Sequence, residues 1–180
     1  MDNSANGNYR ISGVISNKAD AYGLIRAQQS NIATQVIDHK QYASRDLFDN
    51  ALAKAIDEYN PGLIVLAGFM RILGADFVKH YQGRILNIHP SLLPAYPGTN
   101  THQRVLDAGE KQHGVSVHFV TEELDGGPVI AQEAIAIEPT DDADSLAEKI
   151  HQKEHILYPT VVSWFADGRL RLDGNDAYLD

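Results

Sequence analysis

Gly62-Leu-Ile-Val-Leu-Ala67 is a short, uninterrupted apolar run, and it decides how this chain is expected to fold. A run of this kind suits a strand buried on both faces, as strands of parallel sheets are. A second such strand, Arg84-Ile-Leu-Asn-Ile88, follows a short helix predicted over residues 74–81. Strand and helix alternate, which predicts an α/β fold with a doubly wound, mostly parallel sheet. The elements expected upstream, from their apolar spacing, are strands over 9–16 and 32–37 and helices over 20–30 and 44–59, with Ser44 as a helix cap.

The second half of the sequence changes character. Residues 113–120 alternate between apolar and polar, and residues 128–137 form another extended stretch. The glycine pair in Thr121-Glu-Glu-Leu-Asp-Gly-Gly127 indicates a hairpin-like connection between them. Residues 142–165 form a long helix that Pro159 is expected to kink or split, because proline lacks an N–H and clashes with the preceding turn. The final element expected is a strand over 169–172, and the whole chain, 1–180, is expected to form a single domain.

Composition excludes several classes of function. The net charge of −9 disfavours nucleic acid and anionic membranes as partners, because neutralising phosphates needs clustered lysine and arginine. The chain has no cysteine, which excludes disulfides, thiolate catalysis and Cys-ligated zinc. No apolar run approaches the ~20 residues of a membrane span, and the N-terminus lacks the apolar core of a signal peptide. We therefore expect a cytoplasmic protein that acts on small molecules.

The segment Asn87-Ile-His-Pro-Ser-Leu-Leu-Pro-Ala-Tyr-Pro-Gly98 is the strongest candidate for a reaction site. Residues two apart in a strand point to the same face, so Asn87 and His89 lie side by side. The prolines that follow stiffen the loop. The alternative is a buried polar pair before an ordinary loop. Ligands of α/β sheets bind beyond the carboxyl ends of strands, where the loop containing Arg71 is also expected and would supply a local cation.

Five segments of the chain can be compared with known families. They are Ser16-Asn-Lys-Ala-Asp-Ala21, Leu66-Ala-Gly-Phe-Met-Arg-Ile-Leu73, Asn87-Ile-His-Pro-Ser-Leu-Leu-Pro94, Leu124-Asp-Gly-Gly-Pro128 and Trp164-Phe-Ala-Asp-Gly-Arg-Leu170. Together they closely resemble the phosphoribosylglycinamide formyltransferase family, folate-dependent enzymes of purine synthesis. The likeness runs from about Ile11 to near the C-terminus and implies a Rossmann-like formyltransferase fold. It also implies transfer of a formyl group from 10-formyltetrahydrofolate to the amine of glycinamide ribonucleotide.

The resemblance implies three catalytic residues, Asn87, His89 and Asp125. Asn87 would donate an N–H to the oxyanion that forms when an amine attacks the formyl carbon. His89 would stabilise the oxyanion when protonated and help to move a proton to the departing folate nitrogen, since histidine titrates near neutrality. Asp125 would orient the imidazole and favour its protonated form. The alternative for Asp125 is a turn aspartate before Gly126.

The resemblance also assigns the two substrates to particular residues, with no metal. For Arg45 and Glu154 the alternative is a solvated helix face, and for Leu66 it is core packing. His151, one turn before Glu154, stands where relatives often carry an uncharged amide, which puts one substrate contact in doubt. We expect a monomer or homodimer. The folate co-substrate is assigned to Leu66, Phe69, Arg71, Ile72, Leu73, Asn87, Leu124 and Asp125, and glycinamide ribonucleotide to Arg45, Gly68, Met70 and Glu154.

Relatives begin with a strand, a glycine-rich phosphate loop and a helix before the strand equivalent to residues 9–16. That first strand and loop are expected to be absent here, which would leave the sheet with unpaired edges. Asn3-Ser-Ala-Asn-Gly-Asn8 lacks the flanking strand and helix, so it is not expected to be that loop. We accordingly expect weak binding of glycinamide ribonucleotide, and a micromolar affinity in isothermal titration would contradict this.

Other functions remain open at this point. A 10-formyltetrahydrofolate deformylase would use the same three residues with water as the acceptor, and a folate-binding fragment would bind without formyl transfer. A methionyl-tRNA formyltransferase would need a further, more basic domain. His151-Gln-Lys-Glu-His155 matches an inverted zinc-peptidase pattern, but no glutamate follows to supply a third ligand. His39, His80, His102 and His113 are expected at the surface or in the core, and His118 is a candidate for supporting the site.

Overall fold

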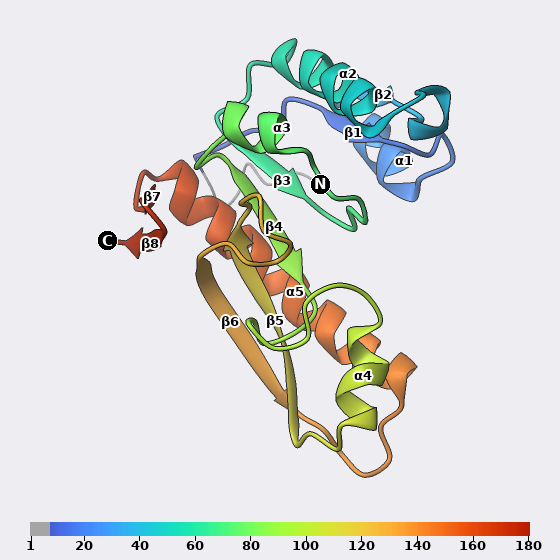
Figure 1. The fold of residues 1–180 in the computed structure, drawn as a ribbon, viewed down its shortest axis with the longest axis vertical. Coiled ribbons are helices and arrows are strands. Elements are labelled where there is room, and N and C mark those ends of the chain that lie inside the picture. Colours follow the sequence, from blue (N-terminus) through green and yellow to red (C-terminus); the bar gives the residue numbers. More distant parts are fainter. Residues whose placement is uncertain (1–7) are drawn as a thin grey trace. The chain divides into compact units, whose positions relative to one another are not determined.

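The computed structural model describes residues 8–180, which divide into two compact units (Figure 1). The first unit consists of the chain to Gly62 together with Leu73–His80, and the second of Leu63–Ile72 and Tyr81–Asp180. The prediction that residues 3–8 are not a phosphate loop concerns a segment that lies almost wholly outside the described residues. The prediction of a single domain over the whole chain stays a prediction.

The first unit contains a parallel pair of short strands with helices after each strand. Strands β1 (Val14–Ser16) and β2 (Thr34–Val36) pair in register from Val14 opposite Thr34. Apolar side chains recur at helical spacing in α1 and α2, so they gather on one face of each helix. These faces form the core of the first unit. Ser44 caps α2 as predicted, since its Oγ accepts the N–H of Leu47 at 3.3 Å. The helical elements are α1 (Tyr22–Gln29), η1 (His39–Gln41), α2 (Arg45–Asp57) and α3 (Ala75–His80).

The second unit is built on a four-stranded sheet with the order β3-β4-β5-β6. β3 (Ile64–Leu66) and β4 (Ile85–His89) are parallel, whereas β5 (Gln112–Phe119) is antiparallel to both β4 and β6 (Val129–Ala136). The α/β fold predicted from the apolar runs is therefore confirmed, as is the hairpin-like connection before β6. Among the described strands β1 and β3 each pair on one side only, so each has an unpaired edge.

Helix α5 (Ala143–Ala166) packs against β5 and β6, and Figure 1 shows it running along the sheet. Asp142 and Ser145 form a capping box at its start. The expectation that Pro159 splits this helix is wrong, because the helix continues through it. Proline removes only one N–H, and the buried side chains of Tyr158 and Val161 on either side keep the helix packed.

Three other elements complete the second unit. They are α4 (Thr101–Asp107), β7 (Leu170–Asp173) and β8 (Asp176–Leu179), the last two forming an antiparallel pair. Helix α4 was not predicted; it is short, and its first flanking residue, Asn100, has a left-handed backbone and no side-chain cap. No helix within residues 8–180 is both long enough and apolar enough to cross a membrane.

Candidate active site

Asn87 and His89 lie two residues apart in β4, opposite β5 in the sheet. The register places Asn87 opposite His118 and His89 opposite Ser116. His89 is 5% exposed, so its imidazole is held within the fold rather than presented on a surface. The prediction that strand spacing brings this amide and imidazole to one face agrees with their place in β4.

Asp125 comes from the connection between β5 and β6, and it meets both histidines of the sheet. Its Oδ2 lies 3.5 Å from His89 Nδ1 and accepts the backbone N–H of Gly98 at 2.8 Å. Its Oδ1 lies 3.8 Å from His118 Nε2. Asp125 has a φ of +51°, which is uncommon for a residue other than glycine and is typically found where the surrounding structure enforces it. The structure thus brings the three predicted catalytic residues together.

The second ring nitrogen of His89 also faces an acceptor. Nε2 lies 2.9 Å from the carbonyl oxygen of Tyr96, a residue whose φ of +55° places it in the left-handed region. A neutral imidazole has one N–H, whereas the imidazolium has one on each nitrogen. Both ring nitrogens of His89 thus face acceptors, the Tyr96 carbonyl on one side and the Asp125 carboxylate on the other.

His118 has the opposite character, because it serves as a neutral acceptor. Its Nδ1 lies 2.9 Å from the carbonyl oxygen of Phe119, and its Nε2 lies 3.2 Å from Asn87 Nδ2. The consistent assignment is that Nδ1–H donates to Phe119 and Nε2 accepts from Asn87. Burial lowers the pKa of His118, while the bond to Phe119 and the Asp125 carboxylate oppose this more weakly. His118 therefore orients the Asn87 amide, whose second N–H can point to a ligand.

A buried hydrogen-bond network holds the proline-rich loop after His89. Ser116 Oγ donates to the carbonyl of Ser91 at 2.6 Å and accepts the N–H of Leu93 at 3.0 Å. Gln132 Nε2 donates to the same Oγ at 2.8 Å and to the carbonyl of Leu93 at 2.9 Å. Since this loop also supplies the Tyr96 carbonyl and the Gly98 N–H, the network fixes the partners of His89 and Asp125.

Sequence reasoning did not identify Tyr96, Gly98, Ser116 or Gln132 as parts of this arrangement. Tyr96 and Gly98 act through backbone atoms, which no side-chain motif reveals. The only signal was the glycine after Pro97, since glycine readily adopts the left-handed backbone that Gly98 shows, with φ +81°.

Two of the residues predicted to bind folate carry exposed apolar side chains: Ile72 is 54% exposed and Leu124 53%. Met70, which was predicted to bind glycinamide ribonucleotide, is 81% exposed. Leu66 ends β3 and is half-buried, as are Phe69 and Arg71. Leu73 is buried and belongs to the first unit, so its part in folate binding stays a prediction.

Among the residues predicted to bind glycinamide ribonucleotide, Glu154 has the most unusual environment. Burial raises its pKa, while the charges of His151, His155 and His89 oppose that shift. His151 lies 4.0 Å from it on the same helix. Gly68 has a φ of +63° in the loop after β3. Arg45 is exposed at the start of α2, in the first unit, and its substrate contact stays a prediction.

The zinc-peptidase pattern gains no support from the structure. His151 and His155 lie in α5, but residues 8–180 contain no group of three or more His, Cys, Asp or Glu side chains that could hold a metal ion. The pattern is therefore read as part of a helix surface.

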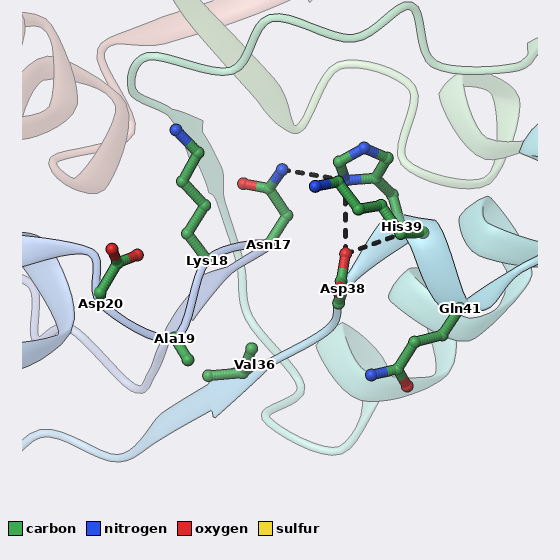
Figure 2. Close-up of a pocket in the computed structure, with 9 residues that line it drawn as sticks. Asn17, Lys18, Ala19, Asp20, Val36, Asp38, His39 and Gln41 are labelled. Carbon is green, nitrogen blue, oxygen red and sulfur yellow. Dashed lines mark hydrogen bonds and ion pairs between the residues drawn. The ribbon is translucent and has the colours of Figure 1, made fainter.

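A pocket of about 300 Å³ lies in the first unit, where β1 and β2 end (Figure 2). In it Asn17 Nδ2 lies 3.1 Å from His39 Nδ1, and Figure 2 shows these two side chains directed toward each other. Two carboxylates and two lysines balance one another around it, so its charge selects no class of ligand. None of the predicted site residues lines it. Its walls are Asn17, Lys18, Ala19, Asp20, Val36, Asp38, His39, Lys40 and Gln41.

Comparison with known proteins places this arrangement in context. Residues 2–162 match the formyl transferase family. The phosphoribosylglycinamide formyltransferase of Escherichia coli is 53% identical over 170 residues, which cover 94% of this chain and 80% of that relative. The enzyme of the same name from Haemophilus influenzae is 47% identical over 171 residues, covering 95% of this chain and 81% of the relative.

Solved structures agree with these sequence relatives. The phosphoribosylglycinamide formyltransferase of Coxiella burnetii, in complex with CHES, has a TM-score of 0.91 and 57% identity, with 95% of this chain and 81% of that chain covered. Glycinamide ribonucleotide transformylase 1 of Symbiobacterium toebii has the same TM-score and 41% identity, with 94% and 80% covered.

Proposed function

We propose that this chain, which belongs to the formyl transferase family and within it resembles the phosphoribosylglycinamide formyltransferases, transfers the formyl group of 10-formyltetrahydrofolate to the amine of glycinamide ribonucleotide. The reaction gives formylglycinamide ribonucleotide in the synthesis of purines. The observation that carries the proposal is the pairing of Asn87 with His118 beside the His89–Asp125 contact.

The chemistry follows from the donors in this arrangement. The substrate amine attacks the formyl carbon, a carbon–nitrogen bond forms, and the carbonyl oxygen becomes an oxyanion. Asn87 has one N–H held by His118 and a second that stabilises the oxyanion, a contact worth roughly 3–4 kcal/mol where it has been removed in other enzymes. The protonated His89 adds a positive charge next to the oxyanion.

Collapse of the adduct breaks the bond to the folate nitrogen, which must gain a proton as the amine loses one. His89 is the titratable group assigned to this transfer. Its ring nitrogens face the Asp125 carboxylate and the Tyr96 carbonyl, so one of these contacts has to open for a proton to reach the folate nitrogen. Asp125 keeps the ring oriented and compensates its positive charge. Direct attack of the amine requires neither a metal ion nor a covalent bond between the formyl group and the enzyme.

The two substrates are assigned to the residues that the family resemblance implies. Ile72 and Leu124 offer exposed apolar area suited to the flat rings of a folate, and Met70, assigned to glycinamide ribonucleotide, is exposed as well. Glu154 has a partly buried carboxylate whose pKa is raised by burial, while the charge of His89 opposes that shift. Such a carboxylate is suited to accept hydrogen bonds from ribose hydroxyls or from the substrate amine. The folate assignment also includes Leu66, Phe69, Arg71 and Leu73, and the ribonucleotide assignment Arg45 and Gly68.

Product analysis tests the proposal. Purified protein is incubated with 10-formyltetrahydrofolate, with and without millimolar glycinamide ribonucleotide, and the products are identified by mass spectrometry. We expect the formyl group on the glycinamide amine and little release of formate when the acceptor is present. Release of formate at the same rate with and without the acceptor would show a deformylase instead.

A further inference from the structure

Helix α5 carries a buried tyrosine whose hydroxyl reaches the main chain of two neighbouring strands. Tyr158 is 8% exposed, and its Oη lies 2.8 Å from the carbonyl oxygen of Leu66 and 2.9 Å from that of Leu86. A phenol has a single O–H, so this proton is shared between the two carbonyls or alternates between them. Burial raises the pKa of Tyr158, which keeps the hydroxyl protonated as a donor.

The two carbonyls lie immediately before the two segments assigned to the reaction. Leu66 is the last residue of β3 and precedes the 67–72 loop, which is assigned to both substrates. Leu86 directly precedes Asn87 and is three residues before His89. A single hydroxyl from a distant part of the sequence therefore touches both strands at the point where each enters the site.

The β3–β4 pair is short. It comprises three register positions, which end with Leu66 opposite Asn87. β3 is only three residues long and pairs with no other described strand. Short edge strands are weakly held, because they lack ladder hydrogen bonds on one side. The second lone pair of each carbonyl can accept the phenol without loss of the ladder.

We propose that Tyr158 is a positioning residue, which ties the ends of β3 and β4 together and so holds Asn87 in a fixed place relative to the 67–72 loop. Tyr158 touches no reacting atom; it acts through Leu66 and Leu86. The catalytic part of this inference rests on the proposed function, whereas the structural part does not. A displacement of about 1 Å can cost on the order of 100-fold in rate, so a small loosening here has a measurable effect.

Tyr158→Phe tests the inference, because it removes only the hydroxyl. Nitrogen-15 NMR of the whole chain should show shifted signals and faster hydrogen exchange for amides of residues 66–72 and 87–89. Val161→Ala is the matched control: Val161 is fully buried on the same helix, three residues further on, and has no polar group. It should lower the melting temperature without this pattern at the strand ends.

The NMR measurement requires no catalytic activity, so it separates failure of this inference from failure of the proposed function. Changes confined to the neighbourhood of residue 158 in α5, or the same pattern in Val161→Ala, would overturn the inference. Where the wild-type chain transfers formyl groups, Tyr158→Phe should lower kcat by roughly 10- to 100-fold while both KM values change by less than about threefold. An unchanged kcat in an active enzyme would also overturn it.

Discussion

Oδ2 of Asp125 lies 3.5 Å from Nδ1 of His89 while it accepts the N–H of Gly98 at 2.8 Å. One carboxylate oxygen therefore joins the imidazole to the proline-rich loop. The other imidazole nitrogen faces the carbonyl of Tyr96 in that same loop. The loop therefore holds the His89 ring directly on one side, through the Tyr96 carbonyl, and indirectly on the other, through Gly98 and Asp125.

Asp125→Asn should lower kcat by about 100- to 10,000-fold, the range in which positioned acid–base groups contribute. The amide oxygen can still accept from Gly98, but the negative charge that compensates an imidazolium formed during the reaction is lost. Steady-state kinetics measure the effect. The control is Asp57→Asn, since Asp57 lies 3.2 Å from His80 in an exposed histidine–aspartate contact. Equal rates for the two variants would contradict the role of Asp125.

Asn87→Ala should lower kcat by roughly 100- to 1,000-fold, because it removes the N–H that stabilises the oxyanion. Asn17→Ala is a matched control: Asn17 Nδ2 lies 3.1 Å from a histidine nitrogen, much as Asn87 Nδ2 lies 3.2 Å from His118. Rates are again measured at saturating substrates. If Asn87→Ala raises KM but leaves kcat unchanged, Asn87 only binds substrate.

The central strands and the candidate residues Asn87, His89 and Asp125 could be predicted from sequence, for two different reasons, whereas β8 was not predicted. Buried apolar runs reveal strands through composition alone, as for β4. Asp125 was found through a motif and looks like an ordinary turn residue otherwise. The contacts of Tyr96 and Gly98 could not be predicted, because backbone atoms bind whatever the loop conformation brings to them, and that conformation depends on Ser116 and Gln132 from other strands.

Helix α5 shows where a local rule failed. Pro159 was expected to kink or split the helix, but the helix is not split, because packing of the flanking residues outweighs one missing hydrogen bond. His118 was considered only as a supporting residue, and the structure gives it a definite partner in Asn87, since register across the sheet places them opposite each other.

Ser116→Ala should lower the free energy of unfolding by about 1–3 kcal/mol, because it leaves the buried N–H of Leu93 without its partner. Urea unfolding measures this loss. Ser163→Ala is the control, because it removes a solvent-exposed bond from Oγ to the carbonyl of Pro159 and should change stability by less than ~0.5 kcal/mol. A loss for Ser116→Ala no larger than that of the control would contradict the importance of the network.

Stability should fall as the pH is lowered through the range in which His113 stays neutral. Burial lowers the pKa of His113 from 6.5 to about 4, and the positive charges of His102 and His89 act in the same direction. The unfolded chain gains a proton below pH 6.5 while the folded chain does not, so this contribution to stability is complete above that pH and is lost as the pH falls toward 4. The loss from this group is about 3 kcal/mol.

Urea unfolding between pH 7 and pH 4 measures that contribution. His113→Gln should flatten the pH dependence, whereas the exposed His155→Gln should retain the wild-type slope. His113 Nε2 and His102 Nδ1 lie 2.9 Å apart and share one hydrogen bond. Two neutral imidazoles can form this bond, one as donor and the other as acceptor. A wild-type slope in His113→Gln would assign the acid sensitivity to other groups.

The comparison of His89→Ala with His80→Ala tests the central claim most directly. Both remove an imidazole that contacts an aspartate, but His80 is exposed and lies outside the site, whereas His89 is buried beside Asn87 and Asp125. We predict that the rate of formyl transfer to glycinamide ribonucleotide at saturating substrates falls by about 100- to 10,000-fold in His89→Ala and stays near the wild-type value in His80→Ala. Equal rates in the two variants would contradict the account.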